Sequence, residues 1–170
     1  MRQSGALQSG AQALTRRVVA AAILLAFVTG FQALGLPQLA TGPVVNATLF
    51  LAAWTVGPLF GAAIGLLTPV VAIWRGILAA PLAPMVPFIA VGNGVLVVIA
   101  YYLRRVHLSV AIAVAAVAKF ALLATAVRAL VSVPAPIAVA MQWPQLYTAI
   151  LGGLVAWLVW KALPASYRMW

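Results

Sequence analysis

The absence of any acidic side chain constrains the fold and chemistry of this chain more than any other feature. The 170 residues include ten Lys and Arg, one His, no Cys and no Asp or Glu. Carboxylate cages for Ca²⁺ or Mg²⁺, paired-carboxylate hydrolysis and acidic relays for protons or Na⁺ are therefore excluded. With His107 alone, a protein-built zinc site is excluded as well. We expect no enzyme activity, no metal site and no cofactor.

The other residues are mostly apolar and fall in successive blocks. The chain is 66% hydrophobic and 6% charged, with a mean hydropathy of +1.18. A composition of this kind suits lipid rather than water as the main solvent. The basic residues lie mostly at the ends of the apolar blocks, which is typical of membrane topology signals and not of a nucleic-acid surface. We therefore expect an all-α integral membrane bundle of about six transmembrane helices, with no nucleic-acid partner.

Gly, Pro and Arg divide the chain into three parts. Residues 1–15 are rich in Ser, Gly and Gln and are expected to form a mobile or interfacial cytoplasmic tail. Residues 16–163 are expected to form the six-helix domain, and residues 164–170 a short cytoplasmic end. A basic start followed by an apolar stretch is also typical of a secretory signal peptide, but the long first block and the later spans favour a membrane helix.

Breaks in the apolar pattern set the expected spans. We expect five of them near residues 18–34, 41–57, 58–75, 108–131 and 147–161. The fourth span follows a loop containing Pro81, Pro84 and Pro87, and closes at Tyr101-Tyr102. A second Pro-rich loop, around residues 134–144, precedes the sixth.

The distribution of positive charge predicts the orientation of these spans. The basic residues expected on one side are Arg2, Arg16, Arg17, Arg104, Arg105, Lys161 and Arg168. Only Arg75 and Arg128 fall near the other side, and Lys119 lies within the fifth span. Because positive loops stay inside, both termini are expected in the cytoplasm.

Small residues recur every four positions in two spans. The two stripes are Ala22-Ala26-Gly30 in the first span and Gly57-Gly61-Gly65 in the third. A four-residue step places small side chains on one helix face, where another helix can approach closely. For the third span we expect packing within the bundle. The stripe on the first span could equally dock another protein.

Two cations at membrane depth have no acidic partner in the chain. Lys119 lies near the middle of the fifth span, and Arg128 lies nine residues further on. Lys119 could be neutral, could extend to the interface or could bond backbone carbonyls, and Arg128 could reach the outer interface. Alternatively, a ligand or partner carboxylate could be the counter-ion. A nine-residue step places the two on nearly opposite faces, and Arg128 is the better candidate because it lies further out.

Polar residues gather on the same outer side and predict a ligand pocket. The candidate substrate-binding residues are Asn46, Arg75, Asn93, Arg128, Gln142, Trp143, Gln145 and Tyr147. Trp143 and Tyr147 could also be interfacial anchors. Asn93 lies between two glycines inside the fourth span, where an uncharged amide either bonds a neighbouring helix or faces a cavity.

Five segments carry a resemblance to a known family: Ala22 and Ala26, Gly42-Pro43-Val44-Val45-Asn46, residues 57–65, residues 84–89 and Gly92-Asn93. Together they resemble the S components of energy-coupling factor (ECF) transporters, the membrane subunits that capture vitamins. The resemblance covers roughly residues 17–102, and the remainder agrees by hydropathy alone. It implies a six-helix bundle whose first helix docks on a transmembrane T subunit through Ala22 and Ala26. It also implies two cytoplasmic ATPase subunits, a substrate pocket in the outer half and a location in the plasma membrane of a prokaryote.

The predicted function is therefore a substrate-binding importer subunit for a small water-soluble vitamin or related nutrient. The unpaired cations favour a carboxylate-bearing substrate, and ATP hydrolysis would be supplied by the partner subunits. The chain has no acidic residue for ion coupling and no Walker-type loop. The alternative is a structural or assembly membrane protein without a small-molecule ligand.

Overall fold

The computed structural model describes residues 2–164, with side chains from Gly10 onward, and this part of the chain is all helical. Its elements in chain order are α1 (Arg2–Gln32), α2 (Gln38–Thr55), α3 (Pro58–Trp74), the 3₁₀ helix η1 (Ala80–Met85), α4 (Val86–Leu103), α5 (Leu108–Thr125), the π-helical turn η2 (Ala126–Leu130), α6 (Ala135–Ala140) and α7 (Trp143–Ala162). The expected all-α class is confirmed for these residues. Most of the expected C-terminal end, residues 165–170, lies outside them.

Glycine and proline end the helices where the sequence predicts. Gly57 has a φ of 92° and caps α3, whose first residue is Pro58. A positive φ suits Gly because no Cβ clashes with the backbone, and Pro needs no hydrogen-bond acceptor in the first turn. The tight turn expected between the second and third spans is therefore present.

Four segments differ from the expectation. Residues 2–15 continue the first span as part of α1, since this segment is rich in Ala, Leu and Gln and contains no Pro. The Pro-rich loops contain helical turns, η1 and α6. Helix α7 begins at Trp143, four residues before the predicted start, because Pro144 is tolerated in the first helical turn.

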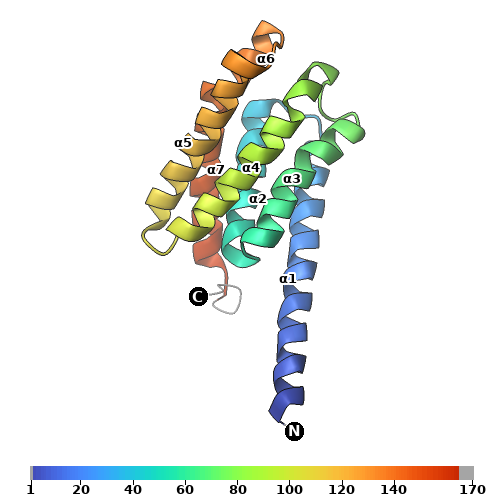
Figure 1. Ribbon diagram of the computed structural model, residues 1–170, viewed down its shortest axis with the longest axis vertical. Helices are drawn as coiled ribbons and strands as arrows, with labels where there is room; N and C mark the ends of the chain where they lie inside the picture. Colours follow the sequence, from blue (N-terminus) through green and yellow to red (C-terminus); the bar gives the residue numbers. More distant parts are fainter. Residues whose placement is uncertain (1, 165–170) are drawn as a thin grey trace.

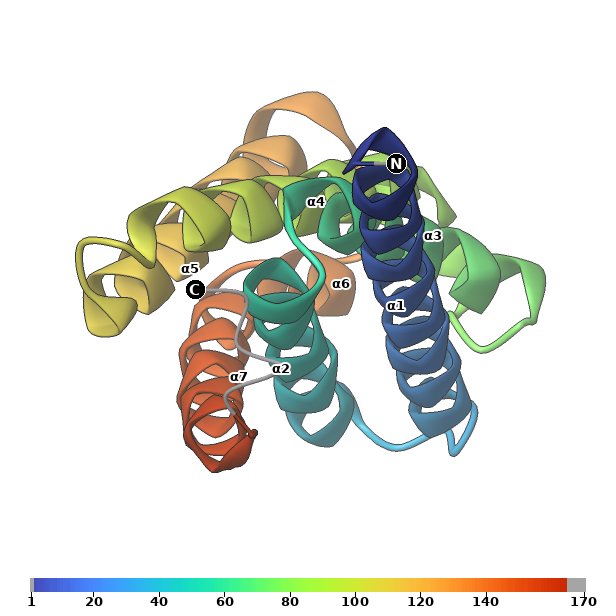
Figure 2. The same ribbon diagram turned by 90° about the horizontal axis from the view of Figure 1, so that it is seen from below.

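Helix α2 lies at the centre of the bundle. It packs against α7, α4, α3 and α1, while α4 also packs against α3 and α5. Helix α1 has its main contacts with α2 and α3 alone, and Figure 2 shows it at the edge of the bundle, away from α5. Its N-terminal half extends beyond the other helices (Figure 1).

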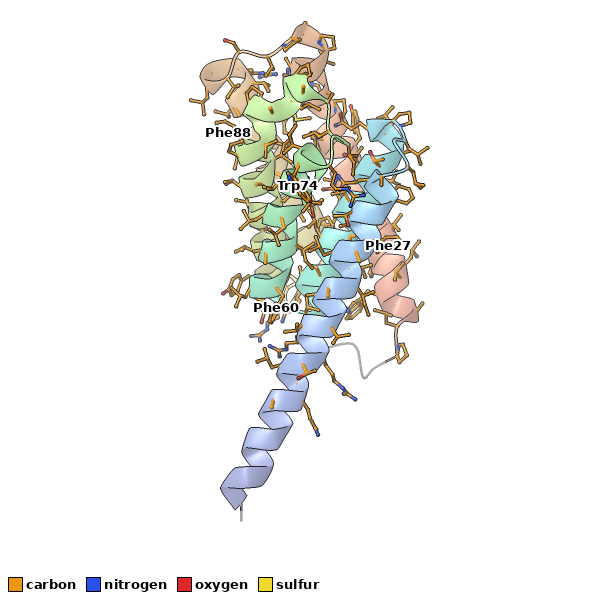
Figure 3. The ribbon with its side chains drawn as sticks, turned by 90° about the vertical axis from the view of Figure 1, so that its right-hand side faces the viewer. Phe27, Phe60, Trp74 and Phe88 are labelled. Atoms are coloured by element: carbon orange, nitrogen blue, oxygen red, sulfur yellow. The ribbon has the colours of Figure 1, made fainter. Side chains whose placement is uncertain are left out.

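The bundle has two chemically different ends. We call the lower end in Figure 1 the basic end: Arg104 and Arg105 follow α4 there, Lys161 lies near the end of α7, and Arg16 and Arg17 are exposed on α1. We call the upper end the cavity end, because a cavity lined by residues of several helices lies there. Helix α3 runs between them, with Phe60 near the basic end and Trp74 near the cavity end (Figure 3).

The described chain contains helices that can cross a membrane. Three segments are long and apolar enough: Gly10–Gln32, Ala80–Leu103 and Leu108–Leu130. Pro58–Trp74 is apolar but shorter. Large apolar side chains such as Ile23, Val114 and Leu158 are exposed on the outside of the bundle. These features are typical of a membrane protein.

Glycines permit the closest helix contacts. A Cβ on Gly61 would lie 2.8 Å from Val97 Cγ1, and one on Gly65 would lie 3.0 Å from Asn93 Cβ. The predicted packing of the third-span stripe within the bundle is confirmed for these two residues. Gly57 does not take part, because it is the cap before α3 and nothing lies within 4 Å of its added Cβ.

Candidate functional site

A cavity of about 240 Å³ lies at the cavity end. The α1–α2 and α3–η1 connections border it, together with residues from α2, α3, α4, α5 and α7. Its polar side chains come from Gln32, Gln38, Thr41, Asn46, Thr68, Asn93, Lys119 and Gln145. The other lining residues are mostly apolar, among them Val45, Pro69, Ala72, Leu82 and Ile89. An apolar cavity with a few convergent polar groups is the usual form of a small-molecule site.

Among the described residues that line the cavity, Lys119 is the only Lys or Arg. Its side chain is 3% exposed, and its Nζ donates to Asn46 Oδ1 at 2.7 Å. Within residues 2–164, this is the only hydrogen bond that the structure gives the amino group. Lys119 therefore neither extends to the bundle surface nor bonds a backbone carbonyl, two of the alternatives that its sequence position left open.

Asn46 is held in place by the tight contact between α2 and α7. Its Nδ2 donates to Gly42 O at 2.9 Å and lies 3.5 Å from Thr148 Oγ1. A Cβ on Gly152 would lie 2.7 Å from Asn46 Cβ and 2.6 Å from Pro43 O. Because Nδ2 faces a carbonyl, which only accepts, the amide orientation is determined and Oδ1 points to Lys119.

Asn93 is linked to α3 through a carbonyl that a proline leaves free. Pro69 has no N–H, so it cannot donate to the carbonyl of Gly65 four residues before it. Asn93 Nδ2 donates to this carbonyl at 3.0 Å. Its Oδ1 is buried and has no hydrogen-bond partner among the described residues. Asn93 therefore does both things that its position suggested: it bonds a neighbouring helix and it lines a cavity.

The remaining polar side chains that line the cavity each have separate contacts. Gln38 Nε2 donates to Ala140 O at 3.0 Å, which ties the start of α2 to the end of α6. Gln145 Nε2 has a long contact of 3.8 Å with Met141 Sδ. Gln32 Oε1 is buried without a partner within the described part of the chain. Thr68 Oγ1 donates to Ile64 O in its own helix.

Five predicted binding residues do not line this cavity. Arg75 is exposed at the end of α3. Arg128 is exposed on the η2 turn, where its Nε and Nη2 donate to Gln142 Oε1 at 2.9 and 2.6 Å. Trp143 and Tyr147 are 55% and 62% exposed. Of the predicted set, Asn46, Asn93 and Gln145 line the cavity.

The aromatic residues at the start of α7 form a surface cluster. The Trp143 ring lies 5.1 Å from the Phe120 ring and 6.3 Å from the Tyr147 ring, measured between centroids. This cluster covers the outside of α5 and α7. Its exposure suits interfacial anchoring better than contact with a ligand in the cavity.

The first-span stripe lies on the free face of α1. Ala22, Ala26 and Gly30 are exposed, whereas Leu24 and Val28 pack on the bundle core. The stripe therefore does not serve packing within residues 2–164. It remains a predicted docking face.

Five polar lining residues were not in the predicted binding set: Gln32, Gln38, Thr41, Thr68 and Lys119. For the cation of the site, the sequence favours Arg128 over Lys119. Gln32 and Gln38 flank the break between the first two spans, and a polar residue beside such a break was the available signal. Thr68 gives a weaker signal, because Thr within an apolar helix commonly bonds its own backbone.

Comparisons with protein-family models, curated proteins and solved structures gave no match. Within the described residues, no group of three or more His, Cys, Asp or Glu side chains could hold a metal ion. The cavity instead combines an amino group, amides and hydroxyls. Such groups hold a polar molecule through hydrogen bonds.

Proposed function

We propose that this chain is the substrate-binding subunit of an ECF-type importer for a small water-soluble vitamin or related nutrient. In this proposal the chain binds its substrate without changing it. The observation that carries the proposal is the buried Lys119 at a cavity that also holds Asn93 Oδ1, which has no hydrogen-bond partner among residues 2–164. Buried polar groups at membrane depth are costly, so they are retained where they serve a ligand or a pathway.

The proposed topology has six spans and both termini in the cytoplasm. Helices α1, α2, α3, α4, α5 and α7 would be the spans. The basic end would face the cytoplasm and the cavity end the outside, in agreement with the unequal distribution of Lys and Arg. A cavity bordered by outer connections would admit substrate from outside.

The energy for uptake would come from partners. No acidic residue is present for ion coupling. We propose a transmembrane T subunit and two cytoplasmic ATPase subunits as partners, with Ala22 and Ala26 of α1 as the docking residues. The exposure of these alanines and the sparse contacts of α1 support a role outside the bundle.

Identification of a co-purifying small molecule tests the proposal. The full chain would be purified from membranes of cells grown in rich medium, and bound molecules identified by mass spectrometry. We expect a nutrient retained by the wild type and lost in Ala79→Trp, which adds bulk to a lining residue. Ala63→Trp, on the exposed face of α3 away from the cavity, is the matched control. If wild type and Ala79→Trp retain the same molecules, the structural or assembly alternative is favoured.

A further inference from the structure

The amino group of Lys119 has hydrogen-bonding capacity that the described residues do not use. An ammonium carries three donors, and Asn46 Oδ1 accepts one of them. No acidic side chain exists in the chain to accept the others or to balance the charge. Since the side chain is 3% exposed, bulk water does not solvate it freely. An anionic acceptor for the Lys119 amino group must therefore come from a molecule other than this chain's side chains.

Asn93 needs a hydrogen-bond donor, whereas Lys119 needs an acceptor. Its Nδ2 faces the carbonyl of Gly65, so the buried atom without a partner is the oxygen Oδ1. The residue is 1% exposed. An amide oxygen in this position requires a donor. Gln32 Oε1, also without a partner in the described chain, lines the same cavity.

We propose that the cavity binds a small monocarboxylate that also carries an uncharged O–H or N–H donor. The carboxylate bonds the Lys119 amino group beside Asn46, and the neutral donor bonds Asn93 Oδ1. This inference rests on the proposed function and names its substrate class. It moves the anion site from the exposed Arg75 and Arg128 to the buried Lys119.

A neutral donor fits better than a second charge. A ligand ammonium would be repelled by Lys119 in the same cavity and would find no carboxylate in this chain. The volume also limits the ligand. About 240 Å³ is below the range of roughly 300–1,000 Å³ typical of sites for drug-sized molecules.

Matched probes separate the ligand classes. The purified full chain would be incubated with three sets on common skeletons: lactate, methyl lactate and alanine; mandelate, methyl mandelate and phenylglycine; pantothenate and its neutral alcohol pantothenol. Retained molecules would be measured by affinity selection and mass spectrometry. Within at least one set, we expect the hydroxy or amide acid to be retained at least about 30-fold better than its ester, alcohol or amino analogue.

Variants assign the anion site. Lys119→Met keeps an unbranched apolar side chain up to the Cε position but removes the amino group, and is expected to weaken retention of the acid about 30-fold or more. Arg105→Gln, at the basic end, is the control and should bind as the wild type. Retention that survives Lys119→Met, or that is lost only in Arg128→Gln, would overturn the assignment.

The outcomes also distinguish this inference from the proposed function. If the chain retains a nutrient from rich medium but prefers neutral or cationic probes, or retains none of the probes, the substrate class is wrong and the importer proposal stands. If it retains nothing from rich medium and no probe, both fail. Because the comparison of probes uses the wild type, the test does not depend on the folding of Lys119→Met.

Discussion

Lys119 Nζ and Asn46 Oδ1 lie 2.7 Å apart, although 73 residues separate them in the chain. Their hydrogen bond joins α5 to α2 beside the cavity. The fifth span alone presents Lys119 as an isolated cation, whereas the folded bundle gives it one amide acceptor and a space in which a second acceptor can bind.

Replacing the acceptor tests the role of the pair. Asn46→Asp supplies the carboxylate that Lys119 lacks, and it should therefore compete with an anionic ligand. We expect retention of the preferred acid to fall by about 30-fold or more, measured by the same affinity selection. Gln12→Glu, which adds one negative charge on the exposed part of α1, should leave retention unchanged. Equal binding by Asn46→Asp and wild type would show that Lys119 does not hold the anion.

The Asn93 contact with the carbonyl freed by Pro69 can be measured with a double-mutant cycle. Asn93→Ala leaves Gly65 O unsatisfied, and we expect the free energy of unfolding to fall by about 1–3 kcal/mol. In a Pro69→Ala background, the backbone N–H of residue 69 can donate to this carbonyl. The loss from Asn93→Ala should then be smaller by about 1 kcal/mol. Reversible unfolding in mixed micelles measures both values, and additive losses would contradict the link.

The close contact between α2 and α7 predicts that one methyl group added at Gly152 lowers the stability of the bundle. Gly152→Ala places a Cβ 2.6 Å from Pro43 O, so the two helices must separate. We expect a loss of about 1–3 kcal/mol in the free energy of unfolding. Gly30→Ala is the control, because nothing lies within 4 Å of its added Cβ and helical Ala is favoured over Gly. A Gly152→Ala protein as stable as Gly30→Ala would argue against the close approach.

The exposed stripe on α1 predicts a separation of binding from uptake. Ala22→Trp or Ala26→Trp should abolish uptake in cells that contain the proposed partner subunits, because bulk there prevents close helix approach. Binding of the retained nutrient to the purified chain should not change, since neither residue lines the cavity. Leu158→Trp, at an exposed position of α7, is the matched control. Loss of binding in the α1 variants would place the stripe in the ligand site instead.

The unequal distribution of charge predicts the orientation. The natural chain has no Cys, so single cysteines report one site each. Thr15→Cys and Ala162→Cys, at the basic end, should be labelled only from the cytoplasm, and Ala79→Cys only from outside. Labelling with a membrane-impermeant maleimide, compared between intact and opened cells, determines on which side of the membrane each cysteine lies. Labelling of Thr15→Cys and Ala162→Cys from outside would reverse the proposed topology.

Local sequence rules predicted the helical elements because they depend on neighbouring residues. Gly57 followed by Pro58 marks a helix start wherever it occurs, since the required φ and the missing N–H are properties of the two residues. The four-residue spacing of Gly61 and Gly65 likewise predicts a close helix contact. The same rules were weaker at Trp143 and at residues 2–15, where Pro144 and polar residues are compatible with both loop and helix.

Tertiary structure decided which polar residues meet. The nine-residue step between Lys119 and Arg128 predicts that their side chains point in nearly opposite directions around the helix axis. It does not predict which of the two faces the inside of the bundle. That choice depends on the packing of α5 against α4 and α7, which turns Lys119 toward Asn46 and leaves Arg128 exposed beside Gln142. The link from Pro69 to Asn93 depends likewise on the register of α3 against α4. Contacts between distant helices are set by the whole core, so periodicity within one helix does not predict them.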